Sequence, residues 1–339
     1  MLRYLKYEAK KSLMIFIATL LSGIFLFIPI IFNGMFFDIE VVFSYIGYYM
    51  FINIIIFIIY GFSYNKKRRS SDLYYSLPVS HEGILASKLI VYGGELLVTL
   101  IALIIEGFIA CNILNGKDIS GFIYEFKNED MMRLLYIILI QVATIIPLFS
   151  VLLWGYMKAN NLSDGIFYMA FLMIIPLLLG NICKYILEVS LDNDTVINGL
   201  SLGLFNMLVA YPKYYIYASS GLVYNTYLLL GIIITISSLL LIIPLYLNAK
   251  NRYAEEIELS DNSYFGYKIL VPVFIILMLS QIIIIFGGDI SVKIASYFGA
   301  IALEYLLFAY FERGFFLKKG NIIDLIATGV LMLLPVILI

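Results

Sequence analysis

The sequence is poor in the residues from which metal and catalytic sites are usually built. Among 339 residues it has one histidine, two cysteines and one tryptophan. A zinc site needs several Cys or His ligands at short spacing, and His81 has no such neighbours in the sequence. A Ser-His-Asp triad would have to recruit the same histidine. We therefore expect no catalytic centre, no metal site and no cofactor in this chain.

A phosphate-binding loop is also missing from the sequence. The nearest fragment, Gly116-Lys117-Asp118, lacks the upstream glycine and the following Ser or Thr of such a loop. Cys111 and Cys183 fall in or at the edge of apolar stretches, where buried free thiols are the expected form. The chain is thus expected to be a non-enzyme that hydrolyses no ATP by itself.

Charge is scarce, at 13% of residues, while 63% of residues are hydrophobic. Soluble domains have a very different composition, and a membrane span needs about 20 mainly apolar residues. About nine stretches qualify: Ser12–Asn33, Val41–Phe62, Leu89–Asn112, Met132–Met157, Asp164–Glu188, Asn225–Asn248, Ile269–Gly287, Ser291–Phe311 and Ile322–Ile339. Lipid cannot satisfy exposed backbone groups, so these spans should be helices. The predicted fold is an all-α polytopic membrane protein with about nine transmembrane helices.

The basic residues predict the orientation of these spans. Six of the 22 Lys and Arg residues fall on one side or at its span ends: Lys117, Lys127, Arg133, Lys184, Lys213 and Lys293. The other sixteen fall on the side of the N-terminus: Arg3, Lys6, Lys10, Lys11, Lys66, Lys67, Arg68, Arg69, Lys88, Lys158, Lys250, Arg252, Lys268, Arg313, Lys318 and Lys319. Because positively charged loops stay in the cytoplasm, we expect a cytoplasmic N-terminus. The expected location is the plasma membrane, with the lipid bilayer and not nucleic acid as a partner.

The same pattern predicts how the chain is organised. Residues 1–11 form an amphipathic lead-in helix on the inner membrane surface, with a plain set of anchoring charges as the alternative. Residues 12–339 form the transmembrane domain. Its longer connections are a cytoplasmic loop at 63–88, outer loops at 113–131 and 189–224, and a cytoplasmic connector at 249–268. The apolar end at Ile339 fits either a short outer C-terminus or a sequence trimmed from a longer one.

Acidic residues inside the spans are the usual sign of an ion or substrate pathway. Glu95 and Glu106 are eleven residues apart in the third predicted span, which places them on one helix face. Glu304 lies midway along the eighth span, and Asp324 near the start of the ninth. We regard Glu95 and Glu304 as candidate pathway residues. The alternative is an acid near the interface or hydrogen-bonded to a neighbouring helix, which we favour for Glu106 and Asp324.

The cytoplasmic loop at 63–88 has the most informative local pattern. It begins with four consecutive cations, Lys66-Lys67-Arg68-Arg69. Pro78 disfavours helical conformation in the residue before it. Ser80 is then predicted to cap a short helix whose first turn carries Glu82, where an acid suits the helix dipole. This helix should continue into the third span through Ile84, Leu85 and Lys88.

At these residues the chain resembles the membrane subunits of type-2 ATP-binding-cassette transporters, the bacterial permease family of exporters. The matching features are an acid after the basic run, a Leu-Pro-x-Ser segment and a helix ending near a lysine, carried by Asp72, Leu77, Pro78, Ser80, Ile84 and Lys88. A second stretch, Lys250–Glu256, is similar to the connector after the sixth span in permeases of Gram-positive bacteria. The resemblance implies a coupling helix for a partner ATPase, formed by Asp72, Leu77, Pro78, Ser80, His81, Glu82, Ile84, Leu85 and Lys88.

The resemblance further implies a permease subunit that exports an amphiphilic compound, such as an antimicrobial peptide, a drug or a lipid. Separate ATPase subunits would bind the ATP and Mg, and a second permease subunit, identical or related, would complete the transporter. Members of the family often have six spans, so the role of the last three spans stays open. Two other classes are alternatives: an ion-gradient-driven secondary transporter using Glu95 and Glu304, and a membrane-embedded enzyme, which the shortage of histidine disfavours.

Overall fold

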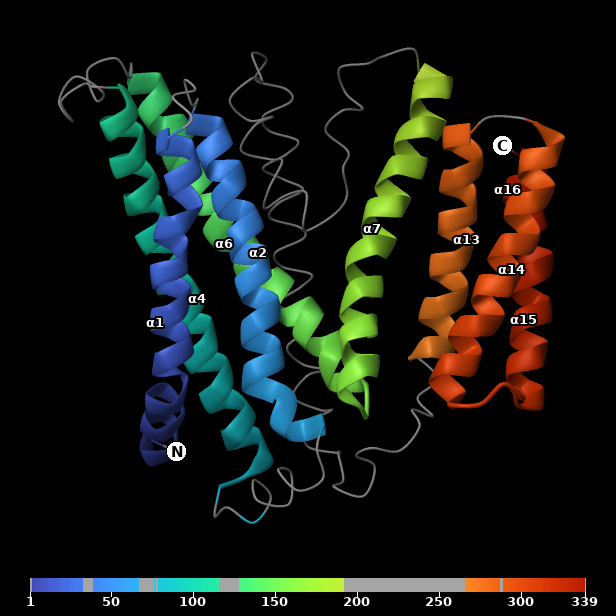
Figure 1. Cartoon of the computed structure of the whole chain (residues 1–339), viewed down its shortest axis with the longest axis horizontal. Helices are drawn as coiled ribbons and strands as arrows, with labels where there is room; N and C mark the ends of the chain where they lie inside the picture. Colours follow the sequence, from blue (N-terminus) through green and yellow to red (C-terminus); the bar gives the residue numbers. More distant parts are fainter. Residues whose placement is uncertain are drawn as a thin grey trace. The chain divides into compact units, whose positions relative to one another are not determined.

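The fold is taken from a computed structural model of the chain, which describes residues 2–32, 39–66, 76, 79–115, 128–191, 266–286 and 289–338. Every regular element in these ranges is a helix (Figure 1). In chain order they are α1 Leu2–Phe32, α2 Ile39–Phe62, the short 3-10 helix η1 Ser63–Lys66, α4 His81–Asn115, α6 Asn128–Lys158, α7 Leu162–Leu191, α13 Tyr267–Phe286, α14 Ile290–Glu312, α15 Lys319–Leu331 and α16 Leu333–Leu338.

Seven stretches within the described helices are long and apolar enough to cross a membrane: Phe43–Phe62, His81–Gly107, Gln141–Lys158, Leu162–Ile182, Tyr267–Phe286, Ile290–Glu312 and Lys319–Ile337. Each matches one of the predicted spans, which supports a helical membrane protein. The first predicted span is helical in α1 as far as Phe32 but is not one of the seven. The sixth, Asn225–Asn248, lies outside the described residues, as do residues 192–224 of the predicted outer loop at 189–224 and most of the predicted connector at 249–268.

The helices belong to two compact units. Unit 1 comprises residues 1–63, 75–151 and 204–251, and unit 2 comprises residues 64–74, 152–203 and 252–339. In unit 1, α4 packs against both α1 and α2. In unit 2, α13 packs against α7, α14, α15 and α16. The start of α4, with the predicted coupling residues Ser80 to Lys88, is part of unit 1.

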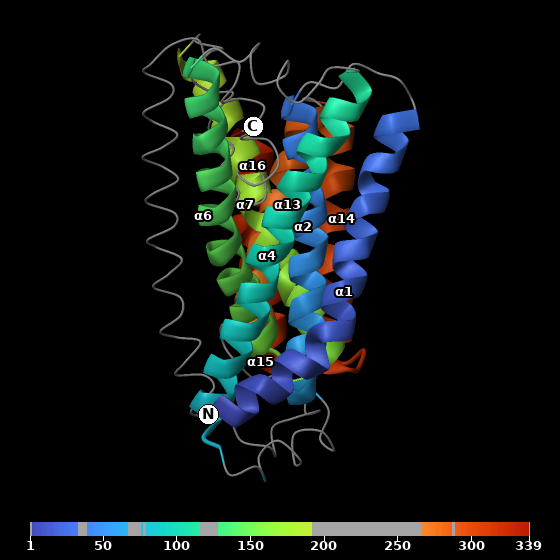
Figure 2. The same ribbon diagram turned by 90° about the vertical axis from the view of Figure 1, so that its left-hand side faces the viewer.

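In unit 1, helices α1 and α4 lie side by side and run parallel. Glu8 of α1 contacts Lys88 near the start of α4. Further toward the C-terminal ends of both helices, Gly23 of α1 faces Glu106 of α4. The first turns of α1 lie beside the base of α4 (Figure 2). A Cβ atom at Gly23 would lie 2.7 Å from the Leu103 side chain, so the glycine permits the close approach of the two helices.

Aromatic side chains fill the base of unit 1, where α2 meets α4. The Tyr92 ring is fully buried and lies 6.0 Å from Phe57 and 6.1 Å from Phe62, measured between ring centroids. Gly61 leaves the space for this ring, because a Cβ there would lie 2.5 Å from it. Phe149 of α6 closes the cluster, with its centroid 6.5 Å from that of Phe62. This packing fixes the position of the N-terminal half of α4.

In unit 2, the core is a stack of aromatic rings between α7, α13 and α14. Tyr267 and Phe311 are stacked at 5.2 Å with nearly parallel rings, and Tyr168 continues the stack at 5.6 Å from Phe311. The Tyr168 hydroxyl also accepts a hydrogen bond of 3.0 Å from the Tyr267 N–H at the start of α13. Asn321 of α15 donates to the Tyr267 hydroxyl at 3.2 Å and to Glu312 at 2.6 Å. One buried cluster therefore connects four helices.

Lys66, the first of the four consecutive cations in the predicted cytoplasmic loop, makes its contacts within the protein. Its side chain is buried, and its ammonium donates to the backbone carbonyls of Tyr156, at 2.5 Å, and Ala159. Tyr156 lies in the last turn of α6 and Ala159 directly follows the helix. The last carbonyls of a helix lack partners within it, and a cation is favourable at this end of the helix dipole. Lys66 is therefore a cap for α6.

The predicted ninth span is interrupted. Helix α15 ends at Leu331, Met332 forms its C-cap, and α16 begins at Leu333. Pro335 explains the break, because proline has no N–H to donate to the carbonyl four residues earlier. The sequence Lys319–Ile337 as a whole is still apolar and long enough to cross a membrane.

Candidate functional site

The candidate functional site is the predicted cytoplasmic end of α4. Ser80 caps this helix: its hydroxyl accepts a hydrogen bond of 3.1 Å from the Gly83 N–H, and its carbonyl accepts one of 3.0 Å from the Ile84 N–H. From His81 the helix runs through 35 residues to Asn115. The predicted cap and the predicted continuation into the third span are thus both confirmed.

The side chains of this segment divide into an exposed end and a buried base. Ile84, Leu85 and Lys88 keep only 1%, 2% and 0% of their surface exposed, so they pack within unit 1. Ser80 is exposed, and Val79, His81, Glu82 and Gly83 are half-buried. Asp72, Leu77 and Pro78 lie outside the described residues. Of the described residues predicted to take part in coupling, Ser80, His81 and Glu82 are the ones that a partner can reach.

Lys88 lies at the centre of a buried polar cluster. Its ammonium is 3.1 Å from the carboxylate of Glu8, and both side chains are fully buried. The ammonium also donates to the Gly61 carbonyl of α2 at 2.8 Å. The Tyr4 hydroxyl donates to the same carboxylate at 2.7 Å. A buried charge is tolerated only when it is paired and hydrogen-bonded, and here the pairing joins α1, α2 and α4.

The lead-in residues of the sequence therefore take part in this cluster. Tyr4 and Glu8 lie on the buried face of the first turns of α1, whereas Arg3, Lys6 and Lys10 are exposed. Sequence reasoning did not single out Glu8. The sequence feature that could have identified it is that Glu8 is the one acid among the first eleven residues, which are rich in lysine, and lies four residues after Tyr4.

Glu95 and Glu106 share one face of α4, as their spacing predicted, and this face lies against α1. Ser12 of α1 donates to one carboxylate oxygen of Glu95, and an oxygen of Glu106 would lie 3.2 Å from a Cβ at Gly23. The second oxygen of Glu95 has no hydrogen-bond partner among the described residues. Glu95 thus has the bond to a neighbouring helix that the alternative interpretation expects.

Glu304 belongs to unit 2 and is fully buried on α14. Neither of its carboxylate oxygens meets hydrogen-bond geometry with a described residue, although Thr328 and Asp324 of α15 lie nearby. The Thr328 hydroxyl donates to the Asp324 carbonyl at 2.8 Å. The fold therefore brings Glu304 and Asp324 into one neighbourhood.

The described part of the chain contains no group of three or more His, Cys, Asp or Glu residues arranged to hold a metal ion. Comparisons of the chain with protein-family models, with curated proteins and with solved structures find no match. The assignment of a function therefore depends on the residues of this chain and on the geometry of α4.

Proposed function

We propose that the chain is the membrane-spanning permease subunit of a type-2 ATP-binding-cassette transporter in the plasma membrane. In this proposal a separate ATPase binds the ATP and Mg, and its closure drives export of an amphiphilic compound. The observation that supports this function most directly is the continuity of α4. Its exposed, Ser80-capped end and the candidate span His81–Gly107 belong to the same helix.

The buried base of α4 suits it for transmitting force. Displacement of an exposed helix end reaches the span only if the first turns neither unwind nor slide. The Ser80 cap opposes unwinding, and the pairing of Lys88 with Glu8 opposes sliding against α1. A push at Ser80, His81 and Glu82 would then move α1 and α4 together and change which side of the membrane the pathway faces.

The burial pattern dictates which residues test the docking role. Changing Ile84 or Leu85 would disturb the core of unit 1 and would not report on docking. His81→Glu and Glu82→Lys alter charge at reachable positions. The control, Lys10→Glu, reverses one charge on the exposed face of α1, as Glu82→Lys does at α4 with the opposite sign. We expect the first two variants to lose ATPase in co-purification and to lose ATP-dependent export, while Lys10→Glu retains both.

The thermal midpoint of each purified variant should stay near that of the parent chain, because none of the three side chains is in the core. Full recovery of the ATPase with both His81→Glu and Glu82→Lys would refute the docking role. An equal loss of ATPase in Lys10→Glu would also refute it, because a change of surface charge away from α4 would then have the same effect.

A gradient-driven carrier is the second candidate, and the burial of Glu304 favours it. A fully buried carboxylate is costly to ionise, which is a property of groups that bind and release a cation or proton. The discriminating experiment uses the purified chain in liposomes with an ion gradient and no ATP. Transport that Glu304→Gln abolishes would favour the carrier, and transport only with ATPase and ATP would favour the permease.

A further inference from the structure

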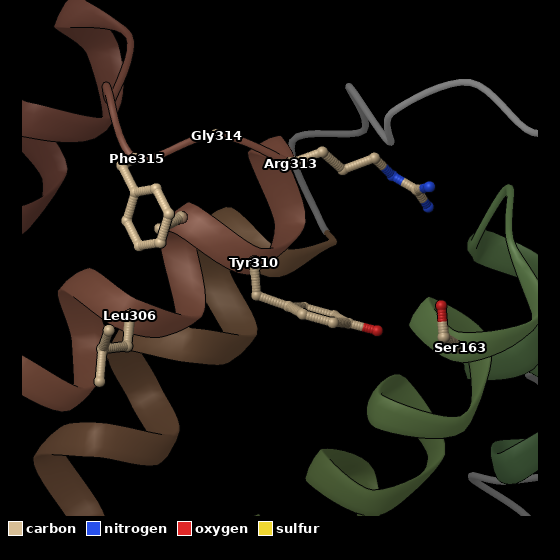
Figure 3. Close-up of a pocket in the computed structure, with 7 residues that line it drawn as sticks. Ser163, Leu306, Tyr310, Arg313, Gly314 and Phe315 are labelled. Atoms are coloured by element: carbon tan, nitrogen blue, oxygen red, sulfur yellow. The ribbon is translucent and has the colours of Figure 1, made fainter.

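A pocket of about 500 Å³ lies in unit 2 between the start of α7 and the end of α14. Its lining includes Ser163, Leu306, Tyr310, Arg313 and Phe315 (Figure 3). None of these residues takes part in the candidate site at α4. The pocket therefore calls for a role of its own.

The pocket has a polar end and an apolar end. Figure 3 shows the Arg313 side chain and the Tyr310 hydroxyl extending toward Ser163 of α7, while Leu306 and Phe315 lie at the other end. Leu306 is 55% exposed and Phe315 is 74% exposed. A ligand that fits such a lining combines an anionic or polar group with hydrocarbon.

The polar end lies at the level where candidate spans end. The candidate span on α7 begins at Leu162 and the candidate span on α14 ends at Glu312, so Ser163 and Arg313 lie at span ends, where the membrane interface is expected. Leu306 lies further along α14, inside the span. Lipid headgroups occupy this interface, and basic pockets between transmembrane helices are typical sites for anionic headgroups.

The Arg313 guanidinium has the geometry to bind a phosphate. Its backbone is held in the left-handed region, at φ 56°, by the C-cap of α14, and its side chain is 51% exposed. It lies 3.7 Å from the buried carboxylate of Asp164, a separation beyond hydrogen-bond length. Since a guanidinium carries five N–H donors in a planar fork, the ion pair leaves donors for a second anion.

We propose that this pocket binds an anionic phospholipid, with the headgroup phosphate on Arg313 and Tyr310 and an acyl chain along Leu306 and Phe315. Ser163 lies beside the phosphate, and its hydroxyl donates to Asp164. Arg313 is the main anchor, since Arg and phosphate form strong bidentate hydrogen bonds. Asp164 opposes the phosphate, so that its carboxylate weakens the site. This role is independent of ATPase docking at α4.

The test measures lipid binding to the purified full chain by native mass spectrometry in detergent, with phosphatidylglycerol, phosphatidylcholine and glycerol phosphate as probes. We expect preference for phosphatidylglycerol and a loss of about tenfold in its affinity in Arg313→Gln, as for one lost charged hydrogen bond. Lys319→Gln is the matched control, because Lys319 is an exposed cation that does not line the pocket. Its affinity should be unchanged.

A second variant, expected to raise the affinity, distinguishes a loss of the binding site from misfolding. Asp164→Asn removes the opposing charge at nearly constant shape, so it should raise the affinity for phosphatidylglycerol severalfold, which damage to the fold would not do. Equal losses in Arg313→Gln and Lys319→Gln would overturn the proposal, as would a lower affinity in Asp164→Asn. Binding of glycerol phosphate as tight as that of phosphatidylglycerol would identify a site for free phosphate and overturn the lipid assignment.

Discussion

The ammonium of Lys88 and the carboxylate of Glu8 form an ion pair of 3.1 Å in which both side chains are completely buried. Removal of one partner should be far more damaging than removal of both, because a single buried charge is left uncompensated. We expect Lys88→Met to lower the free energy of unfolding by about 3–5 kcal/mol. The double variant Glu8→Gln with Lys88→Met should recover much of this loss.

The measurement is a double-mutant cycle on denaturation midpoints of the purified chain in detergent. The single variant Glu8→Gln completes the cycle. Additive effects of the two substitutions would show that Glu8 and Lys88 are not energetically coupled.

Ser80→Ala should loosen the first turn of α4. The substitution removes the hydroxyl that accepts the Gly83 N–H at 3.1 Å, at a cost of about 1 kcal/mol. Faster hydrogen exchange is expected at Gly83 and Ile84, whereas amides deep in the span should not change. Ser80→Asp restores an acceptor and should return exchange to the parent rate. If Ser80→Ala and the parent exchange alike, the cap does not hold the helix start.

Substitution by alanine should lower the stability of the protein at Gly61 but not at Gly94. At Gly61 a Cβ would lie 2.5 Å from the buried Tyr92 ring, so Gly61→Ala should destabilise unit 1 by about 1–3 kcal/mol through overpacking. At Gly94 no described atom lies within 4 Å of the added Cβ. Gly94→Ala should thus be neutral or slightly stabilising, as alanine is the better helix former. Thermal midpoints of the two variants measure the contrast, and equal midpoints would contradict the packing at Gly61.

The predicted orientation can be tested by cysteine labelling of intact cells. In a chain whose Cys111 and Cys183 are replaced by alanine, Ser80→Cys and Ser291→Cys place single thiols at exposed positions at the starts of two candidate spans. The predicted topology puts these two positions on opposite sides of the membrane. An impermeant maleimide should label Ser291→Cys in intact cells and Ser80→Cys only after lysis. The reverse pattern would place the base of α4 outside the cell and remove the basis for ATPase docking.

Hydropathy predicted the helices well because the apolar length of a span is a local property. The predicted span Val41–Phe62 differs from α2, Ile39–Phe62, by two residues at one end. The cap at Ser80 was equally predictable, since it depends on a Pro and a Ser within three positions. The break at Met332 had a visible signal in Pro335, which the apolar composition obscured.

The partners of charged residues could not be predicted in this way. Lys66 and Lys88 look like ordinary cytoplasmic cations in the sequence, yet one caps α6 and the other pairs with Glu8. Such pairing depends on how helices distant in the sequence align, and the local pattern carries no information on this alignment. For the same reason the sequence could not show that Ile84 and Leu85 face the core while His81 and Glu82 remain reachable.

The parallel alignment of α1 and α4 restricts the ways in which the protein can change shape. Glu8 of α1 pairs with Lys88 of α4, and Ser12 of α1 donates to Glu95 of α4. A shift of either helix by one turn would separate the buried charges of Glu8 and Lys88. Helices α1 and α4 are therefore expected to move together as one rigid body during transport. Conformational changes should therefore occur at helix contacts other than the one between α1 and α4. A crosslink between α1 and α4 should leave the transport rate unchanged.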